Sequence, residues 1–354
     1  PNLTSLDEVS KLIGQSINGY KIIVNKSTVP IGTAKRLKKI IKENLNDDNK
    51  NHVFDIVSNP EFLKEGEAVN DAFFPERIVI GSESKKAIDM MLQLYRPLIE
   101  QDFSYAENNP NRKESIPVIV TDSTSSELIK YASNSFLATK ISYINEIANI
   151  CERVGANILD VTHGMGLDSR IGSKFMRAGI GWGGSCFPKD IRALAFTAEE
   201  YGAEASILNA VIQVNNYQRY KIVQKSMDIL GIIEDKTIAV LGIAFKPNTD
   251  DTREAPSITI INKFLELGAD VKAYDPVVKN CPEEMDSKVK LMQNAYEAAK
   301  NADLLVILTE WQEFVNLDYN KIIALMKNAN IIDGRNLLDK QKMVSLGFNY
   351  KGIG

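Results

Sequence analysis

Histidine and cysteine are scarce in this chain, and their scarcity limits the chemistry that we expect. The 354 residues include only two histidines, His52 and His163, which are far apart and form no metal-ligand pattern. No metal is expected, and acid and base steps would fall to Asp, Glu, Lys or ordered water. The three cysteines, Cys151, Cys186 and Cys281, are too few and odd in number for a disulfide framework. Free thiols in a reducing compartment, the cytoplasm, are therefore expected.

Long apolar runs and a strong net charge are also lacking. No apolar stretch approaches the length that spans a membrane. The formal net charge is -4, which argues against a dedicated nucleic-acid binder and against a basic membrane-binding face. With 44% hydrophobic and 25% charged residues, the composition is that of an ordinary globular protein, and its length allows more than one domain.

The chain lacks the usual beginning of an α/β domain. It starts with Pro1 rather than Met, and Pro1 to Asn18 has the pattern of a loop followed by one helix. Because a complete domain rarely starts in this way, we expect an N-terminal truncation.

Strands and helices alternate from Lys21 to about residue 121. This alternation is typical of a doubly wound domain with a parallel sheet, here an incomplete one. The predicted elements are a strand at Lys21–Lys26, a helix at Thr33–Glu43, strands at Val53–Ser58 and Arg77–Gly81, and a helix at Lys85–Pro97.

A mostly helical region follows from residue 122 to residue 231. Its first helix is predicted from Ser123 to Val154, because this stretch contains neither proline nor glycine and keeps a helical period. At the usual rise of an α-helix it would be about 45 Å long. Asp122 or Ser123 would cap it. Further helices are predicted at residues 157–164, 190–201 and 209–230.

A second doubly wound domain is predicted from residue 232 to residue 354. Its strands are expected at residues 237–242, 270–276, 303–308 and 330–333, with a helix at 256–267. Ligands of open α/β sheets bind beyond the carboxyl ends of the strands. The residues expected there are Phe245, Lys246, Asp275, Thr309, Glu310 and Arg335.

The segment Gly181–Asp190 carries the most specific chemistry. Glycines let the main chain approach a ligand closely, and Pro188 restricts how the loop relaxes. The thiolate is the nucleophilic form of cysteine, and a nearby cation such as Lys189 favours the thiolate of Cys186. The segment therefore suits covalent catalysis. A glycine-rich turn with a buried cysteine is the alternative. The letters of Gly179–Gly184 match G-x-G-x-x-G, but no strand precedes them in a βαβ unit, so they are not a dinucleotide fingerprint.

Other polar residues are candidates with open alternatives. Lys130 and Asn134 share one helix face and could stabilise an oxyanion, or they could form a solvated polar face. Glu61 and Glu65 follow a predicted strand, where a base would stand, although acids also favour a helix N-terminus. Thr28 lies at a strand-to-helix turn and would face a ligand or serve as an N-cap.

Arg170 and Arg253 are candidate phosphate ligands. Arginine recognises phosphate through two parallel hydrogen bonds. Each could instead form a surface ion pair.

Short motifs follow one another in order along nearly the whole chain. They are Ser27-Thr28-Val29-Pro30, Asn59-Pro60-Glu61-Phe62-Leu63, Glu127 to Asn134, Asn145-Glu146, Arg170-Ile171-Gly172, Gly183 to Asp190, Phe245-Lys246-Pro247, Asp250 to Glu254 and Asp333-Gly334-Arg335. In this order the motifs resemble the UDP-glucose/GDP-mannose dehydrogenase family. The Glu65-Gly66 pair, Pro75–Val79 and Phe187 are more similar to the branch that oxidises UDP-glucose than to the GDP-mannose branch.

The resemblance implies an NAD-dependent, four-electron oxidation of the C6 alcohol of UDP-glucose to the carboxylate of UDP-glucuronate. Cys186 would trap the aldehyde as a thiohemiacetal and then carry a thioester, which water hydrolyses with Glu61 as the base. The other implied roles are oxygen-charge stabilisation by Lys130 and Asn134, and orientation of a water by Thr28 and Asp190.

The resemblance also implies binding positions. Arg170 acts across a subunit interface in the family, so a homodimer is expected, with the long helix in its core. The positions that would meet NAD are Thr28, Glu65, Lys189 and Arg253. The positions that would meet the nucleotide sugar are Glu61, Phe62, Leu63, Lys64, Lys130, Asn134, Arg170, Phe175, Met176, Arg177, Ala178, Gly179, Gly183, Phe245, Lys246 and Arg335.

One departure from the family concerns NAD. Members begin with a strand and a G-x-G-x-x-G turn for the pyrophosphate, and no such segment precedes Lys21. We therefore expect weak NAD binding and an exposed apolar sheet surface. Three domains are expected, namely the remainder of an NAD-binding domain (1–121), a helical dimerisation domain (122–231) and a UDP-sugar-binding domain (232–354). The alternatives are a GDP-mannose or UDP-N-acetyl-hexosamine dehydrogenase, or a non-catalytic remnant that binds nucleotide sugar.

Overall fold

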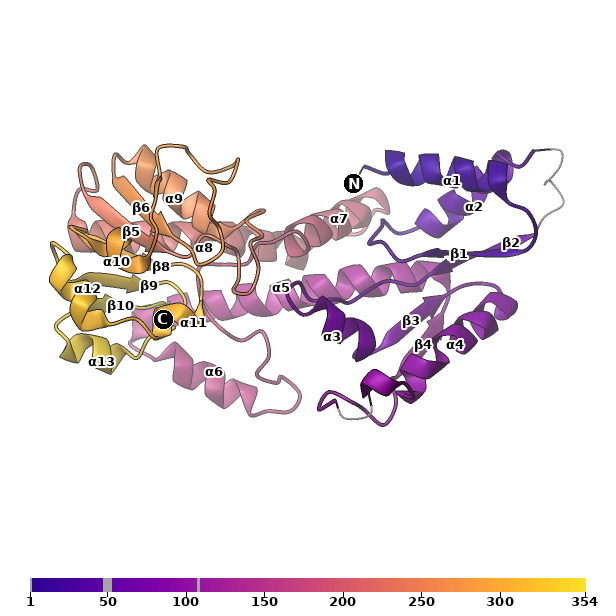
Figure 1. The fold of residues 1–354 in the computed structure, drawn as a ribbon, viewed down its shortest axis with the longest axis horizontal. Coiled ribbons are helices and arrows are strands. Elements are labelled where there is room, and N and C mark those ends of the chain that lie inside the picture. The colour runs from indigo at the N-terminus through magenta and orange to yellow at the C-terminus, as the bar shows by residue number, and fades with distance from the viewer. Residues whose placement is uncertain (1, 47–52, 107–108) are drawn as a thin grey trace. The chain divides into compact units, whose positions relative to one another are not determined.

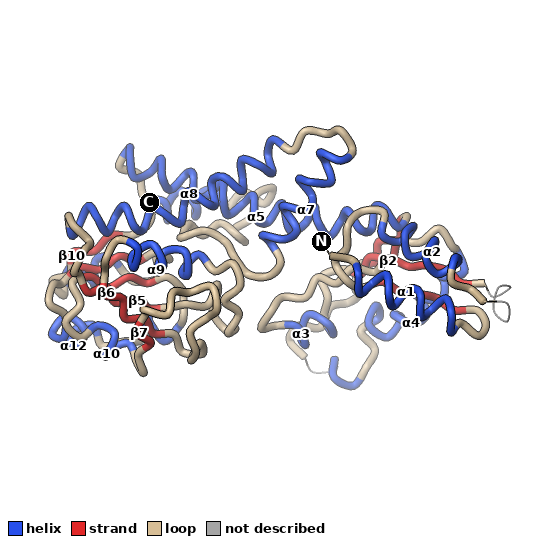
Figure 2. Tube along the Cα trace, turned by 90° about the horizontal axis from the view of Figure 1, so that it is seen from above, coloured by secondary structure: helices blue, strands red, loops and turns tan. Residues whose placement is uncertain are grey.

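The structure is a computed structural model that describes residues 2–46, 53–106 and 109–354. His52 and part of the polar segment after Gln101 lie outside these residues. The chain forms two compact units. Unit 1 comprises residues 1–133 and 196–203, and unit 2 comprises residues 134–195 and 204–354. Figure 1 labels the elements of both units, and Figure 2 separates helices from strands by colour.

Unit 1 contains a sheet whose order, within the described residues, is β1-β2-β3-β4. The pairs β1–β2 and β3–β4 are parallel, whereas β2 and β3 meet as an antiparallel pair at Ser58 and Gly81. The elements are α1 (Thr4–Ser16), β1 (Lys21–Asn25), α2 (Thr33–Glu43), β2 (Phe54–Ser58), α3 (Ala68–Phe73), β3 (Ile78–Gly81), α4 (Lys85–Glu100), a 3₁₀ turn (Ser104–Ala106) and β4 (Val118–Thr121).

Helices pack on both faces of β2, whose successive residues point to opposite sides of the sheet. Ile56 of β2 packs with Leu37 and Ile41 of α2 in one buried cluster. The next residue, Val57, packs in another cluster with Ala87 and Met91 of α4. Figure 1 shows α2 and α4 on opposite sides of the strands, an arrangement typical of a doubly wound domain.

Four helices follow, and the first has the predicted bounds. Asp122 caps it, because its Oδ1 accepts a hydrogen bond of 2.8 Å from the Ser125 backbone N–H. The third helix begins at Phe187, before its predicted start at residue 190. Proline is compatible with the first turn of a helix, so Pro188 does not delay its start. The helices are α5 (Ser123–Val154), α6 (Ile158–Gly166), α7 (Phe187–Glu200) and α8 (Ser206–Leu230).

Unit 2 contains a parallel sheet whose order, among the described residues, is β10-β9-β8-β5-β6-β7. Every residue of β8 is buried, which is typical of a parallel sheet covered on both faces. The elements are β5 (Thr237–Leu241), α9 (Pro256–Glu266), β6 (Asp270–Tyr274), β7 (Lys290–Leu291), α10 (Ala295–Ala299), β8 (Leu304–Ile307), α11 (Gln312–Val315), α12 (Tyr319–Leu325), β9 (Asn330–Asp333), α13 (Lys340–Ser345) and β10 (Asn349–Lys351).

The predicted α/β class is confirmed, as is the mostly helical region that separates the two sheets along the sequence. The strands β4, β7 and β10, each at or beside an edge of its sheet, were not predicted from the sequence. None of the helices in the described part of the chain is long and apolar enough to cross a membrane.

Candidate active site

Cys186 is exposed and stands at the N-terminus of α7 in unit 2. Its carbonyl accepts the first hydrogen bond of the helix, 3.0 Å from the Asp190 backbone N–H, so Cys186 occupies the N-cap position. The alternative of a buried cysteine is therefore wrong. A helix N-terminus stabilises negative charge beside it, and the thiolate is the reactive form of a cysteine.

Asp190 lies one turn after Cys186, on the same side of α7. Its carboxylate is fully buried and each oxygen has a partner in unit 2. Lys189 Nζ donates to Oδ1 at 2.6 Å, and Asn134 Nδ2 donates to Oδ2 at 2.6 Å. The structure thus brings Asn134, Lys189 and Asp190 together. These partners compensate for the desolvation of a buried carboxylate.

The glycine loop before Cys186 packs tightly against the loop that follows β5. A Cβ on Gly183 would lie 2.4 Å from the Glu254 carbonyl oxygen, and one on Gly184 would lie 2.7 Å from the Phe245 ring. The Gly184 N–H also donates to the Arg253 carbonyl oxygen at 3.0 Å. Side chains at either glycine would force these two loops apart, so the loop sequence fits its close backbone packing.

Residues beyond the carboxyl ends of β5, β8 and β9 meet around Arg335. The Arg335 guanidinium is mostly buried and forms an ion pair of 3.1 Å with Glu310. It also donates to the carbonyl oxygens of Leu308, at 2.8 Å, and of Phe245, at 3.3 Å. A Cβ on Gly179 would lie 3.3 Å from Arg335 Nη1. This edge of the sheet therefore brings together Gly179, Phe245 and Arg335, three of the predicted sugar-nucleotide residues.

Asp333 fixes the turn that presents Arg335. The Asp333 carboxylate is fully buried and accepts hydrogen bonds from the backbone N–H groups of Arg335, Leu337 and Leu338, and from the Tyr350 hydroxyl. Burial raises the pKa of Asp333 above its usual value, although these hydrogen bonds oppose the shift. Sequence motifs pointed to Asp333 only as a neighbour of Arg335.

In unit 1, Lys130 and Glu61 form a partly buried pair. Lys130 Nζ donates to the Glu61 carbonyl oxygen at 2.6 Å and lies 3.2 Å from Glu61 Oε1. The Phe62 ring lies next to two cations, 5.2 Å from Lys130 Nζ and 3.9 Å from the centre of the Arg77 guanidinium. These contacts fix the loop after β2 on the first turns of α5. Glu61 lies before α3 and not in its first turn, so the helix-terminus alternative does not apply to Glu61.

Thr28 lies in the turn between β1 and α2. Gly32 occupies the N-cap position of α2, so the N-cap alternative for Thr28 is wrong. Glu127 of α5 holds this turn, since its carboxylate accepts hydrogen bonds from the N–H groups of Gly32, at 2.6 Å, and Ala34, at 2.8 Å. Burial raises the pKa of Glu127. Glu127 had no predicted role, and its signal in the sequence is its place at the start of the motif that also contains Lys130.

Several predicted residues stand outside these clusters. Arg170 pairs with Asp168 at 2.6 Å and Arg253 with Asp251 at 2.8 Å, the surface-pair geometry given as the alternative for each arginine. Phe175 has a ring 6.3 Å from that of Phe187, which follows the cysteine. The remaining predicted binding residues include exposed Leu63, Lys64 and Arg177, half-buried Glu65, buried Met176 and Ala178, and Lys246, whose Nζ lies 5.4 Å from the centre of the Phe245 ring.

Unit 1 has features that fit NAD. The carboxyl ends of the parallel strands β1 and β2 lead into the loops that carry Thr28 and Glu61, and ligands of such sheets bind at this edge. Asn25 ends β1, and its buried Nδ2 has no hydrogen-bond partner among the described residues. A buried donor of this kind is normally satisfied, so it is available to a bound group.

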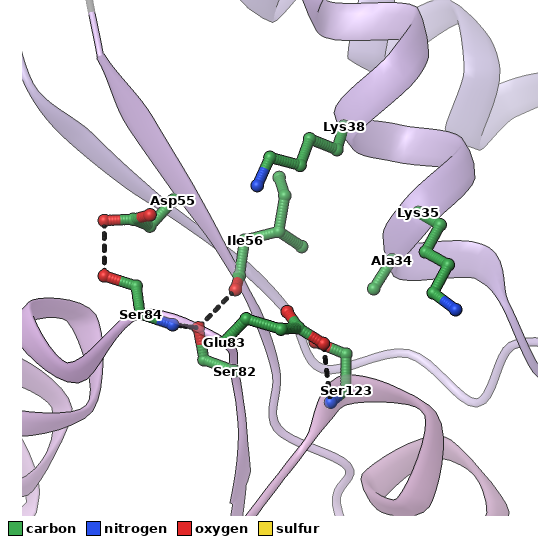
Figure 3. A pocket seen from close by; sticks show the side chains of 9 residues that line it. All are labelled: Ala34, Lys35, Lys38, Asp55, Ile56, Ser82, Glu83, Ser84 and Ser123. Atoms are coloured by element: carbon green, nitrogen blue, oxygen red, sulfur yellow. Dashed lines mark hydrogen bonds between the residues drawn. The ribbon is translucent and has the colours of Figure 1, made fainter.

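A separate cavity of about 110 Å³ lies near the beginning of β2, away from that edge (Figure 3). Its lining carries balanced charges, namely two lysines of α2, Lys35 and Lys38, and two acids, Asp55 and Glu83. Both acids are engaged, with the Ser84 hydroxyl 2.8 Å from Asp55 and the Ser123 hydroxyl 3.0 Å from Glu83. The lining residues are Ala34, Lys35, Lys38, Asp55, Ile56, Ser82, Glu83, Ser84 and Ser123.

Sequence models of three domains match consecutive stretches of the chain. The NAD binding domain of the UDP-glucose/GDP-mannose dehydrogenase family matches residues 1–99, the central domain residues 124–217 and the UDP binding domain residues 239–340. The chain belongs to the UDP-glucose/GDP-mannose dehydrogenase family. The resemblance inferred from the motifs is confirmed, and NAD is the cofactor.

Members of the UDP-glucose/GDP-mannose dehydrogenase family resemble this chain throughout its length. The UDP-glucose 6-dehydrogenase TuaD of Bacillus subtilis is 46% identical, with all of this chain and 73% of the relative aligned. The UDP-glucose 6-dehydrogenase of Rhizobium meliloti is 41% identical, with all of this chain and 78% of the relative aligned. The structure of a UDP-glucose dehydrogenase from Pyrobaculum islandicum superposes with a TM-score of 0.84 at 33% identity, covering 99% of this chain and 75% of the other.

One prediction is not supported by these similarities, and several others stay predictions. The match to the NAD-binding model of the dehydrogenase family starts at residue 1, so it does not support the expected N-terminal truncation. The expected weak NAD binding stays a prediction. The three matched stretches follow the order of the predicted domains, whose boundaries also stay predictions, as do the roles of the individual site residues.

Proposed function

We propose that this protein oxidises the C6 hydroxyl of UDP-glucose to a carboxylate and releases UDP-glucuronate. The structural observation that carries the proposal is Cys186, an exposed thiol at a helix N-terminus with the buried Asp190 one turn away. Relatives named UDP-glucose 6-dehydrogenase, 41–46% identical and aligned over all of the chain, support this substrate. They do not favour GDP-mannose, a UDP-N-acetyl-hexosamine or a non-catalytic remnant.

The reaction needs one sulfur and two oxidations. NAD supplies the hydride acceptor in both. Cys186 sulfur adds to the C6 aldehyde left by the first oxidation, and the C–S bond formed makes a thiohemiacetal. Loss of the second hydride leaves a thioester. Water then attacks the thioester carbon, the C–S bond breaks, and Cys186 leaves as thiolate.

Other groups would move protons and hold charge, as the family resemblance implies. We assign Thr28 and Asp190 to a water that takes the proton of the C6 hydroxyl, and Glu61 to activation of the hydrolytic water. Lys130 and Asn134 would stabilise the developing oxygen charge, because an ammonium and an amide N–H are both donors. These roles rest on the matching family motifs and on the pairs Lys130–Glu61 and Asn134–Asp190.

Ligand-binding roles are proposed for the remaining residues. In unit 2, Gly179, Phe245, Lys246 and Arg335 would bind UDP at the carboxyl edge of the sheet, supported by the match to a UDP binding domain. The other sugar positions are Phe62, Leu63, Lys64, Phe175, Met176, Arg177, Ala178 and Gly183, and those for NAD are Thr28, Glu65, Lys189 and Arg253.

The first prediction concerns stoichiometry. Incubated with limiting UDP-glucose and excess NAD, the protein is expected to form two NADH per sugar, because the sulfur retains the aldehyde until the second oxidation. Absorbance at the NADH band and mass spectrometry of the product measure both quantities. GDP-mannose and UDP-N-acetylglucosamine are the comparison substrates, and equal or faster NADH formation with either would contradict the assignment of UDP-glucose.

The second prediction concerns a homodimer. Phe136, Tyr143 and Ile150 recur every seven residues on α5 with exposed fractions of 65%, 51% and 49%, so they form one apolar stripe. We propose that two copies pair through this stripe, as the family resemblance implies, and that Arg170 then serves the partner's substrate. Phe136→Glu with Tyr143→Glu should convert the dimer to a monomer in light scattering.

Tyr201→Glu is the control for that experiment, because Tyr201 is 75% exposed and lies outside α5. A monomeric wild-type protein, or a double variant that stays dimeric, would refute this interface.

We also place the reaction in the cytoplasm. Cys151, Cys186 and Cys281, all within the described residues, are free thiols. A sulfur that must form and release an acyl group has to stay reduced, which a reducing compartment ensures.

A further inference from the structure

Asn215 of α8 pairs with the backbone of the glycine loop that precedes Cys186. The Trp182 N–H donates to Asn215 Oδ1 at 2.8 Å, and Asn215 Nδ2 donates to the Trp182 carbonyl oxygen at 3.0 Å. Asn215 is only 1% exposed. The amide therefore satisfies both polar groups of one buried loop residue, as a neighbouring strand would.

The other end of the loop is held in the same way. Gln218, one turn after Asn215, donates from Nε2 to the Gly179 carbonyl oxygen at 2.8 Å. Asn145 of α5 accepts from the Gly179 N–H at 2.8 Å. Asn149 Nδ2 donates to Gln218 Oε1 at 3.0 Å and so orients the Gln218 amide.

The close approach of α8 explains a glycine in this loop. Gly181 has a φ of +105°, and a Cβ there would lie 2.6 Å from Asn215 Oδ1. Trp182 is fixed further by its indole, whose Nε1 donates to the Ser142 hydroxyl at 3.0 Å. The backbone from Gly179 to Trp182 is therefore held by side-chain groups of two helices and has little freedom to shift.

The glycine loop, residues 179–184, connects two parts of the proposed site. At its start, a Cβ on Gly179 would lie 3.3 Å from Arg335 Nη1, at the edge where UDP would bind. At its end, the Gly184 N–H donates to the Arg253 carbonyl oxygen, two residues before Cys186. The position of this loop thus sets the position of the sulfur relative to the nucleotide-binding edge.

We propose that Asn215 and Gln218 are positioning residues that hold Cys186 at the right distance from the C6 carbon of a bound UDP-sugar. This inference rests on the proposed function. Asn215 acts at the cysteine end of the loop, so its loss should impair capture of the aldehyde. Gln218 acts at the Arg335 end, so its loss should mainly weaken binding of the nucleotide sugar.

Release of the C6 aldehyde distinguishes a misplaced Cys186 from a protein that is only less stable. In Asn215→Ala we expect kcat to fall about 10- to 100-fold, the loss typical of a misplaced reacting group. NADH formed per UDP-glucose should fall below two, and a hydrazine reagent should trap the C6 aldehyde that escapes. The dissociation constant for UDP should stay within about threefold of the wild type. A variant that was only less stable would lower the active fraction and keep the ratio at two.

Ser226→Ala is the matched control, because Ser226 is a fully buried polar residue of α8 whose hydroxyl donates to the Ile222 carbonyl oxygen of the same helix at 2.8 Å, not to the glycine loop. Its NADH ratio should stay at two. Protection of the buried Cys151 from alkylation, measured by mass spectrometry, checks that each variant is folded.

Gln218→Ala should raise KM for UDP-glucose about tenfold and weaken UDP binding similarly. If Asn215→Ala does not fold, the KM of Gln218→Ala tests the positioning role by itself. A folded Asn215→Ala with a ratio of two, or a folded Gln218→Ala with unchanged KM, would overturn the positioning role. A wild-type protein that forms no NADH from UDP-glucose would instead refute the proposed function itself.

Discussion

Cys186→Ala is expected to abolish steady formation of UDP-glucuronate, with a loss of at least about a thousand-fold in kcat, as for other nucleophile deletions. Without the sulfur, no thiohemiacetal forms, and the second oxidation has no covalently held substrate. The first oxidation does not need the C–S bond, so slow release of the C6 aldehyde with one NADH per sugar is expected. Product analysis by mass spectrometry and NADH absorbance measure the two steps separately.

Cys281→Ala is the control for this variant. Cys281 is also an exposed thiol of unit 2, but its hydrogen-bond partners in the described part of the chain are backbone carbonyl oxygens, with that of Met285 at 3.5 Å from the sulfur. Burial raises the pKa of Cys281, which disfavours its thiolate. Its removal should leave kcat unchanged. Continued production of UDP-glucuronate by Cys186→Ala would end the covalent mechanism.

The long helix α5 could be predicted to the residue, whereas α7 could not. Ser123–Val154 contains no helix breaker and has Asp122 as a capping residue, so local sequence determines both ends. The start of α7 depends on Pro188, which usually signals a break. In the first turn of a helix proline loses no hydrogen bond, so the helix begins at Phe187 and Cys186 becomes its N-cap.

Candidate residues with local motifs could be found from the sequence, but their partners could not. Cys186 and Asp190 stand in one short segment, and their i, i+4 spacing follows from the helix. Asn215 and Gln218 hold a loop that lies 33 and 39 residues earlier in the chain. No periodic pattern encodes such pairings, because they depend on how α8 packs beside the loop.

In unit 1, the first turns of α5 also form pairings with distant segments that the sequence does not reveal. Ser126 donates from its hydroxyl to the Ser58 carbonyl oxygen at 3.0 Å, Glu127 accepts from Gly32, and Lys130 donates to Glu61. One helix face therefore holds the loops that follow β1 and β2. Only Lys130 was proposed from sequence, and the structural contacts give Ser126 and Glu127 a supporting role for Thr28 and Glu61.

Asp190→Asn is expected to lower kcat about 100- to 10,000-fold, the range typical for removal of an acid–base group. The buried carboxylate accepts from Lys189 and from Asn134, one donor on each oxygen. An asparagine side chain has only one oxygen, so its NH₂ group would face one of these donors. That clash would displace Asn134 or Lys189, and the carboxylate proposed to orient the proton-accepting water would be lost.

Asp303→Asn provides a closely matched control, because Asp303 is likewise buried in unit 2 and is also paired with a lysine and an asparagine. Its Oδ1 lies 3.2 Å from Lys327 Nζ and 2.9 Å from Asn328 Nδ2. Asp303 follows α10, away from the carboxyl ends of the strands, so Asp303→Asn should lower Tm and leave kcat unchanged. Steady-state kinetics and thermal unfolding of both variants test this contrast. Equal losses of kcat would mean that Asp190 stabilises the fold and has no direct part in the reaction.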